Sequence, residues 1–314
     1  MHRHADPARW QGRVDTQVEG PRARRWHQAV QPLAVTCAPG SALLGFACDA
    51  GVARNQGRVG AVEGPTALRK ALAGLAWHST RPAWDAGDVV AEEDALEDAQ
   101  AELGAHVARL LAAGHLPLVV GGGHEVAWGS FLGLCAHAAR APAAPVIGVV
   151  NLDAHLDLRA GRPSSGTPFR QIAEACAERR WPFRYLCLGV DEAANTAALL
   201  DTAARLGVRW RRDRDCTPSQ LDAVRADLAG FLAGVDVVQL SVDLDALPAA
   251  VAPGVSAPAA RGVALEVVEA LLDDVLASGR LGLFEVAELN PRLDRDGVTA
   301  KVAARLVDQV ARGR

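Results

Sequence analysis

Carboxylates and imidazoles alternate with small or apolar residues at two places in this sequence. The segment NLDAHLD at residues 151–157 and the segment SVDLD at residues 241–245 each follow an apolar run. In an extended backbone every second side chain points to the same side, so Asp153, His155 and Asp157 share one side, as do Asp243 and Asp245. Neighbouring carboxylates disfavour each other's ionisation. A divalent cation removes that conflict, so the pattern predicts a metal site.

A histidine in a glycine-rich turn adds a further candidate ligand. Residues 120–125 read VGGGHE and place His124 where an apolar run passes into a segment with helical spacing. Glycines there permit unusual backbone angles and close approach of the backbone. The candidate ligands are His124, Asp153, His155, Asp157, Asp243 and Asp245. Because oxygen ligands predominate and no thiolate is among them, two Mn²⁺ ions are favoured over Zn²⁺. Two such ions activate a shared water, so the predicted reaction is hydrolysis.

Each of these segments also has a simpler interpretation. Residues 153–157 alone are compatible with a helix cap or a surface loop, and Asp243 with Asp245 is compatible with a cap of the following segment. The glycine turn is compatible with a phosphate cradle at a helix start. It lacks both GxGxxG and a Walker lysine, however. The remaining histidines have no acid-rich neighbourhood and are interpreted as surface or packing residues.

Short apolar runs that alternate with longer segments of helical spacing must position these residues. The expected strands cover residues 42–48, 116–121, 146–152, 185–190, 235–242 and 281–287. The expected helices cover residues 65–75, 91–113, 125–139, 218–232, 264–278 and 298–310. Near-continuous apolar strands indicate a sheet that is covered on both faces. The prediction is a single three-layer α/β domain with a mainly parallel sheet flanked by helices, and with the polar residues at the carboxyl ends of the strands.

Composition limits the class of partner. The chain has 314 residues, of which half are hydrophobic and 22% charged, which suffices for a large core. A net charge of -4 gives no basic field for nucleic acid or an anionic membrane. The sequence has neither a secretory signal nor a run of 18 apolar residues, and its six cysteines are scattered without a CxxC pair. We therefore expect a cytoplasmic protein with reduced thiols and a small-molecule substrate. Residues 1–35 are expected to form a partly disordered N-terminal arm, and residues 36–314 the domain.

Four motifs in order closely resemble the ureohydrolase family, which includes arginase and agmatinase. They are GGGHE at residues 121–125, DAHLD at 153–157, SVDLD at 241–245 and ELNP at 288–291. The resemblance extends from about Ala42 to the C-terminus and includes GVARNQGR at 51–58 and GAVEGP at 60–65, which look like the family's first loop and helix entry. It implies an arginase-like fold and a homo-oligomer, either a trimer or a hexamer.

The resemblance also implies a role for each candidate residue. His124 would bind one manganese ion and His155 the other, with Asp153 and Asp243 bridging the two. Asp157 would join the ion at His124, and Asp245 the ion at His155. In the family's mechanism a bridging hydroxide attacks a planar guanidino or formimino carbon, and the residue matching Asp157 moves a proton to the leaving nitrogen. Glu288 matches a glutamate that pairs with the substrate's cationic nitrogen, although it is also compatible with a strand-end cap.

Three departures from arginase bear on the substrate. Arginase has a histidine in the loop after its second motif, where residues 164–169 here read SSGTPF with Ser165 at the corresponding place. The turn reads GGGHE rather than GGDHS, and Arg159 follows in DLR. These features resemble the branch of the family that cleaves formimino groups. They imply hydrolysis of N-formimidoyl-L-glutamate to L-glutamate and formamide in histidine degradation.

Arg159 and neighbouring hydroxyl groups are the candidates for binding a substrate carboxylate. The hydroxyls belong to Ser164, Ser165 and Thr167. An alternative for Arg159 is a place on the surface or in an oligomer interface. Residues 245–248 read DALP and lack an acid that many relatives carry before the proline, but no candidate ligand is lost.

Three rival functions remain open from the sequence. The first is another ureohydrolase that acts on arginine, agmatine or a guanidino acid, which urea release would reveal. The second is a metal-binding protein without turnover. The third is a nucleotide-binding module that uses the glycine turn, which stabilisation by nucleotide but not manganese would favour.

Overall fold

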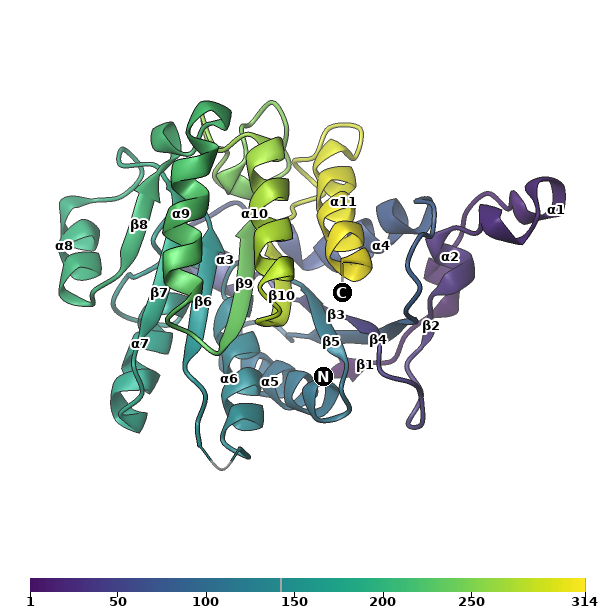
Figure 1. The fold of residues 1–314 in the computed structure, drawn as a ribbon, viewed down its shortest axis with the longest axis horizontal. Helices are drawn as coiled ribbons and strands as arrows, with labels where there is room; N and C mark the ends of the chain where they lie inside the picture. Colours follow the sequence, from purple (N-terminus) through teal and green to yellow (C-terminus); the bar gives the residue numbers. More distant parts are fainter. Residues whose placement is uncertain (142, 314) are drawn as a thin grey trace.

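A mainly parallel β-sheet runs through the molecule (Figure 1). The computed structural model describes residues 1–141 and 143–313, whose strands form one ten-stranded sheet. The strands are β1 (His2–Arg3), β2 (Gln31–Pro32), β3 (Ser41–Ala47), β4 (Ala83–Val90), β5 (Leu116–Val120), β6 (Ile147–Leu152), β7 (Arg184–Val190), β8 (Arg209–Arg212), β9 (Val237–Asp243) and β10 (Leu281–Ala287). Their order is β1-β4-β3-β5-β10-β9-β6-β7-β8, with β2 beside β4. Among these pairs β1 with β4 is antiparallel, and the others are parallel.

Helices cover both faces of this sheet. They are α1 (Thr16–Glu19), α2 (Trp26–Ala29), α3 (Ala50–Arg54), α4 (Gly64–Ala73), α5 (Leu96–Ala112), α6 (Val126–Ala138), α7 (Pro168–Arg179), α8 (Ala197–Arg205), α9 (Leu221–Leu232), α10 (Leu265–Ala277) and α11 (Val298–Arg312). Residues of α4, α9, α10 and α11 share one buried apolar cluster with the sheet, and residues of α5, α6 and α7 share the other. The expected three-layer α/β arrangement is confirmed.

Along the central strands, alternate side chains belong to one or the other of these two clusters. In β6 all six side chains are buried, with Ile147 and Val149 in the cluster on the α6 side and Val150 and Leu152 in the cluster on the α9 side. A strand that is buried on both faces gains apolar burial from every residue. This is why the central strands read as continuous apolar runs.

The six expected strands are all present, with ends within two residues of the prediction. Two expected helices begin too early. Helix α5 begins at Leu96 rather than residue 91, because residues 92–95 form a turn in which Glu93 has a φ of 47°. Residues 218–220 form a 3₁₀ turn, and α9 follows from Leu221. The sequence did not predict β4, β8, α3, α7 or α8, nor the short elements β1, β2, α1 and α2.

The acids in β4 explain why this strand was missed. Its sequence AWDAGDVV carries Asp85 and Asp88, which are buried inside the protein. Arg69 of α4 compensates them, with its guanidinium nitrogens 2.9 Å from Asp85 and 2.6 Å from Asp88. Buried charges require such partners. Their partner lies outside the strand, so the local sequence reads as polar.

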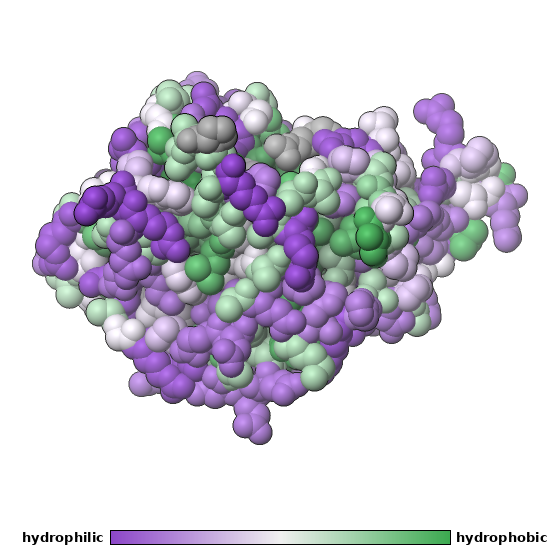
Figure 2. Space-filling model, turned by 90° about the horizontal axis from the view of Figure 1, so that it is seen from below, coloured by the Kyte–Doolittle hydropathy of each residue, from purple (hydrophilic) through white to green (hydrophobic). Residues whose placement is uncertain are grey.

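The first 35 residues contact the rest of the protein at several points. Strands β1 and β2 pair with β4, the Trp10 indole donates to Asp85 at 2.7 Å, and the Trp26 indole donates to Asp308 at 2.7 Å. Figure 1 and Figure 2 both show the part around α1 projecting from the body. Val18, in α1, is 90% exposed. Among the helices described, none has the length and apolar character needed to cross a bilayer.

Four neighbouring strands bring distant polar residues to one edge of the sheet. Strands β5, β10, β9 and β6 are consecutive in the sheet although not in the chain. At their carboxyl ends lie His124, Glu288, Asp243 and Asp153, respectively. In parallel sheets this edge is the usual place for a ligand.

Candidate metal centre

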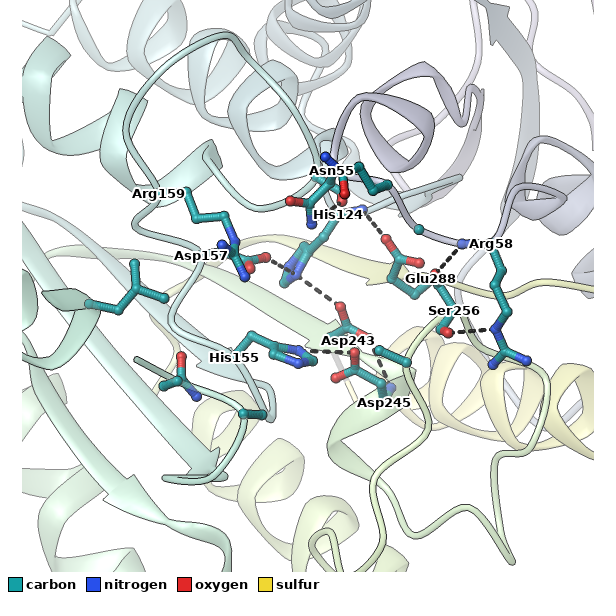
Figure 3. Close-up of a pocket in the computed structure, with 17 residues that line it drawn as sticks. Asn55, Arg58, His124, His155, Asp157, Arg159, Asp243, Asp245, Ser256 and Glu288 are labelled. Carbon is teal, nitrogen blue, oxygen red and sulfur yellow. Dashed lines mark hydrogen bonds and ion pairs between the residues drawn. The ribbon is translucent and has the colours of Figure 1, made fainter. Parts of the chain in front are cut away.

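A pocket of ≈ 360 Å³ opens at this edge of the sheet (Figure 3). It is lined by Asn55, Gln56, Gly57, Arg58, His124, His155, Asp157, Arg159, Ser165, Ala194, Asn195, Leu199, Asp243, Asp245, Ser256, Ala257 and Glu288. Asp153 lies beneath the lining and is fully buried. The pocket therefore contains five of the six predicted ligands and has the sixth at its floor.

One group of candidate ligands surrounds the His124 ring. Its Nδ1 lies 3.1 Å from Asp153 Oδ2, 3.1 Å from Asp157 Oδ2 and 3.0 Å from Asp243 Oδ2. The other ring nitrogen, Nε2, lies 2.9 Å from the Ser241 hydroxyl. His124, Asp153 and Asp157 present ligand atoms close enough to hold a single ion.

A second group surrounds His155 and shares one residue with the first. His155 Nδ1 lies 3.1 Å from Asp245 Oδ2 and 3.5 Å from Asp153 Oδ1. Asp153, His155 and Asp245 therefore form a second set that is able to hold an ion. The two carboxylate oxygens of Asp153 face different histidines, which is the arrangement expected of a bridging ligand.

The charges of this cluster fit bound cations. Of the residues that the structure describes, no lysine or arginine forms an ion pair with Asp153, Asp157, Asp243 or Asp245. Burial, together with the nearby carboxylates, raises the pKa of Asp157, Asp243 and Asp245. Such a group of acids binds either protons or metal ions.

The histidines respond to the same charges. Attraction to Asp245 raises the pKa of His155. Burial acts to lower the pKa of His124, but the facing carboxylates of Asp153, Asp157 and Asp243 outweigh it and raise this pKa. His124 Nδ1 has no hydrogen-bond partner of suitable angle although three carboxylate oxygens face it. A divalent cation at Nδ1 would satisfy this buried nitrogen and the three oxygens together, so the residues fit a divalent metal.

Backbone geometry at the site is unusual at two functional positions. Asp157 and Glu288 have φ angles of 48° and 67°, in the left-handed region that such side chains rarely adopt. Residues in this region concentrate at functional sites, where surrounding contacts hold them. The strand-end loops here are therefore shaped by the site more than by local preference.

The glycine turn before His124 needs its lack of side chains. A Cβ at Gly122 would lie 1.6 Å from the Cys48 carbonyl oxygen, and the Gly122 carbonyl accepts a hydrogen bond from Glu288 N at 2.8 Å. Only glycine lets the turn pass between the ends of β3 and β10. The turn delivers His124 to the pocket.

Glu288 is placed beside the cluster by this turn. Its Oε1 accepts the His124 backbone N–H at 2.9 Å, while its buried Oε2 has no hydrogen-bond partner. Burial raises the pKa of Glu288 well above the usual value, with Asp243 adding to the effect. The free oxygen is available to a hydrogen-bond donor in the pocket.

The four residues expected to bind a substrate carboxylate are divided by the structure. Arg159 and Ser165 line the pocket, and Ser165 Oγ accepts a hydrogen bond from Asn55 at 3.2 Å. Ser164 and Thr167 are outside the lining. The Thr167 hydroxyl is hydrogen-bonded within its own turn, to Ser164 O at 2.9 Å and to Gln171 at 3.0 Å.

Other residues of the pocket were not singled out from the sequence. Asn195 supports the second motif, because its Oδ1 accepts from Leu156 N at 3.0 Å and its Nδ2 donates to Ala154 O at 2.9 Å. Arg58 donates to the Ser256 and Val255 carbonyls, both at 2.8 Å. The segment GVARNQGR carried a signal for Arg58, because it resembles the family's first loop. We find no comparable signal at Asn195 or Ser256.

Comparison with known proteins identifies the class. The family model described as the arginase family matches residues 40–312 of this chain. This match covers most of the chain and includes every candidate ligand. The protein belongs to the arginase family.

More particular similarities point to one branch of that family. The chain is 57% identical to the formimidoylglutamase of Ralstonia nicotianae, covering 100% of this chain and 97% of the relative. It is 56% identical to the formimidoylglutamase of Chromobacterium violaceum, covering 96% of this chain and 97% of the relative.

Solved structures share the fold. The formimidoylglutamase of Bacillus subtilis matches with a TM-score of 0.80 at 20% identity, over 93% of this chain and 92% of the other. Trypanosoma cruzi formiminoglutamase, whose structure contains Mn²⁺, matches with a TM-score of 0.76 at 27% identity, over 88% of this chain and 93% of the other. The expected arginase-like fold and the expected family are confirmed.

Proposed function

We propose that this protein is a manganese-dependent hydrolase that converts N-formimidoyl-L-glutamate and water to L-glutamate and formamide. The observation that carries the proposal is the pair of ligand groups that share Asp153 at the carboxyl edge of the sheet. The similarity to formimidoylglutamases over nearly the whole chain supports the choice of substrate.

The proposed centre holds two ions per chain. His124 and Asp157 would hold one ion and His155 and Asp245 the other, and Asp153 and Asp243 would be shared between the two. When bound, the ions lower the pKa of a shared water and polarise the carbon under attack. Mn²⁺ suits this set of carboxylates and imidazoles, and it occurs in the similar Trypanosoma cruzi structure.

Two acids of the chain orient the substrate and move its proton. In our proposal Asp157, which lines the pocket, takes the proton of the attacking water and gives it to the α-nitrogen of glutamate. The bond between the formimino carbon and that nitrogen breaks, the hydroxyl proton left on the carbon passes to the departing amine, and the carbon leaves in formamide. Glu288 Oε2, buried and without a partner, accepts a hydrogen bond from the cationic amidine nitrogen.

Arg159 and Ser165 are the proposed contacts for a substrate carboxylate. Both line the pocket, and Arg159 forms no ion pair with any acid among the residues described. A guanidinium binds a carboxylate through parallel, charge-assisted hydrogen bonds. Ser164 and Thr167 keep a supporting part in the proposal, because they shape the turn that carries Ser165.

A direct test measures products from competing substrates. Protein loaded with manganese should release formamide and glutamate from formimidoylglutamate. Its kcat/KM should exceed that for arginine by about a hundredfold or more, a gap of roughly 2.7 kcal/mol in transition-state stabilisation. Agmatine should also be a poor substrate, since it has no carboxylate. Release of urea from arginine or agmatine, with formimidoylglutamate left intact, would instead support a guanidino hydrolase.

The oligomeric state is a separate proposal. We propose that residues 36–314 form the ureohydrolase domain and that the protein assembles as a trimer or hexamer, as the family resemblance implies. Analytical ultracentrifugation of the full chain tests this, and a monomer at micromolar concentration would contradict it.

A further inference from the structure

A row of buried polar side chains lies directly beneath His124 and outside the pocket. It consists of Ser130 in α6, Gln239 and Ser241 in β9, and Glu285 in β10, and each is 0% exposed. None of them lines the pocket, so none is placed to touch substrate. A carboxyl group that is fully buried is costly to keep ionised unless it is paired or hydrogen-bonded.

One contact, at the Ser241 hydroxyl, connects this row to the metal centre. The Ser241 hydroxyl lies 2.9 Å from His124 Nε2, on the side of the ring opposite the three aspartates. When a metal ion binds Nδ1, the neutral imidazole carries its proton on Nε2, and Nε2 donates to Ser241. The hydroxyl proton of Ser241 is then free to be donated further.

Glu285 is the carboxylate placed to accept that proton. It is paired in register with Ser241 on the neighbouring parallel strand, so both side chains lie on the same face of the sheet. Gln239 Nε2 donates to Glu285 Oε1 at 2.9 Å, and this same amide donates to Ala127 O at 2.9 Å. Burial raises the pKa of Glu285, whereas the nearby polar groups of Ser130, Gln239 and Ser241 act in the opposite direction. Its second oxygen, Oε2, is buried and has no hydrogen-bond partner, so it is available to a hydroxyl donor.

We infer that Glu285 is a positioning residue for the metal centre, acting through the Ser241 hydroxyl to hold the proton of His124 on Nε2 and its Nδ1 lone pair toward the ion. The inference deepens the proposed function and rests on it, because it assumes that the centre binds manganese. Hydrogen-bond partners behind a metal-binding histidine fix its tautomer and its ring orientation. An acceptor behind the ring also makes the imidazole a better electron donor to the ion.

Manganese binding is the direct readout. Free Mn²⁺ is counted by electron paramagnetic resonance while metal-free protein is titrated, for the wild type, Ser241→Ala, Glu285→Gln and the double variant. The wild type should bind two ions. We expect Ser241→Ala to weaken one of them by about 10–100-fold, the range known for such supporting residues, and Glu285→Gln to weaken the same ion.

The double variant tests whether the two residues act in series. If Glu285 acts through Ser241, the substitution Glu285→Gln should not weaken binding further once Ser241 is alanine. A double variant whose loss is the sum of the two single losses would overturn the action through Ser241. Glu285→Gln keeps the side chain's shape and one acceptor oxygen, so it remains informative if Ser241→Ala does not fold.

A matched control separates positioning from core stability. Leu283 lies two residues before Glu285 on the same face of β10 and is fully buried. Leu283→Ala should lower the melting temperature of the metal-free protein and leave the affinity for both ions unchanged. If Glu285→Gln behaves in the same way, Glu285 is only a core residue and the inference is wrong.

The outcomes also distinguish this inference from the proposed function. A wild type that binds no manganese would overturn both. A wild type that binds two ions, with Ser241→Ala and Glu285→Gln binding both as tightly, would overturn the positioning role alone.

Discussion

Asp153 turns one carboxylate oxygen toward His124 and the other toward His155. Burial opposes the ionisation of Asp153, but the proximity of these two histidines outweighs it and lowers the pKa. Asn151 Nδ2 donates to its Oδ2 at 2.9 Å, and His155 N donates to its Oδ1 at 2.6 Å. Both oxygens are therefore fixed in direction before any ion binds, and this residue is the most sensitive point of the proposed centre.

Asp153→Asn should abolish turnover by replacing one bridging oxygen with an amide nitrogen, which carries no lone pair for a metal. We expect kcat/KM for formimidoylglutamate to fall by about a thousandfold, or ~4 kcal/mol, and metal analysis to find fewer than two manganese ions. Asp201→Asn, at an exposed position in α8, is the control and should match the wild type. Activity within tenfold of the wild type, with two ions retained, would contradict the bridging role.

Arg159→Ala tests the carboxylate contact. Loss of a charge-assisted hydrogen bond should raise KM for formimidoylglutamate by about 10–100-fold and change kcat little, since the contact is the same in the bound substrate and the transition state. Arg162 lies three residues further on, outside the pocket lining, and pairs with Asp94. Arg162→Ala should leave both constants unchanged. An equal rise in KM for Arg159→Ala and Arg162→Ala would contradict the assignment of Arg159 as the carboxylate contact.

At the scale of elements, the turn between β5 and α6 depends on the absence of a side chain. Gly122→Ala should destabilise the protein by about 3 kcal/mol, because its Cβ would overlap the Cys48 carbonyl, a backbone atom that cannot rotate away. Gly230→Ala is the opposite case. Gly230 lies inside α9, and a Cβ added there would have its nearest neighbour, a guanidinium nitrogen of Arg209, at 3.8 Å. Gly230→Ala should raise the free energy of unfolding of the protein by about 0.5–1 kcal/mol. Urea unfolding measures the change in the free energy of unfolding of each variant. Changes of the same sign in both variants would contradict the prediction.

Helix α4 and strand β4 are joined by a buried charge cluster. Arg69→Met should lower the free energy of unfolding by about 3–5 kcal/mol, because Asp85 and Asp88 would remain buried without the guanidinium that pairs with both. Arg9 also pairs with Asp88 but is partly exposed, so Arg9→Ala should cost about 1 kcal/mol. Denaturant titration of Arg69→Met and Arg9→Ala measures the free energy of unfolding of each variant. A smaller loss for Arg69→Met than for Arg9→Ala would show that Arg69 is not the main compensating charge.

At the scale of the whole molecule, the N-terminal strand brings a histidine against helix α5. The His106 ring stacks on His2 with centroids 4.0 Å apart. Burial lowers the pKa of His106 to about 4, and the nearby His2 and Arg109 act in the same direction. Below pH 6.5 the unfolded chain therefore takes up a proton at this residue before the folded chain does.

This difference predicts that the free energy of unfolding declines as the pH is lowered from about 6.5 to about 4. The contribution of His106 is on the order of 1 kcal/mol, reduced because the side chain is only half buried. His106→Gln should flatten the decline in urea unfolding measured across this window. An identical slope in the variant would assign the decline to other groups.

The sequence by itself determined the features that depend on neighbouring residues. Strand β10 appears at residues 281–287 as predicted, because a strand buried on both faces is an apolar run that its own residues define. The same holds for the polar residues that follow β6 and β9, since the alternation of side chains in extended chain places Asp153 and Asp243 at the strand ends. The four motifs and their order also predicted the family correctly.

Tertiary structure alone decided the features that depend on residues far apart in the chain. The four strands that carry the centre lie side by side although β6, β7 and β8 separate β5 from β9 in sequence. Strand β4 holds buried acids whose partner, Arg69, is in α4, so no local pattern identifies it. Asn195, which bonds Leu156, and Ser241, which lies against His124, likewise gain their places from contacts between separate elements. Local periodicity follows from neighbouring residues, whereas compensation of buried charge follows from which elements meet, and only the folded chain fixes that.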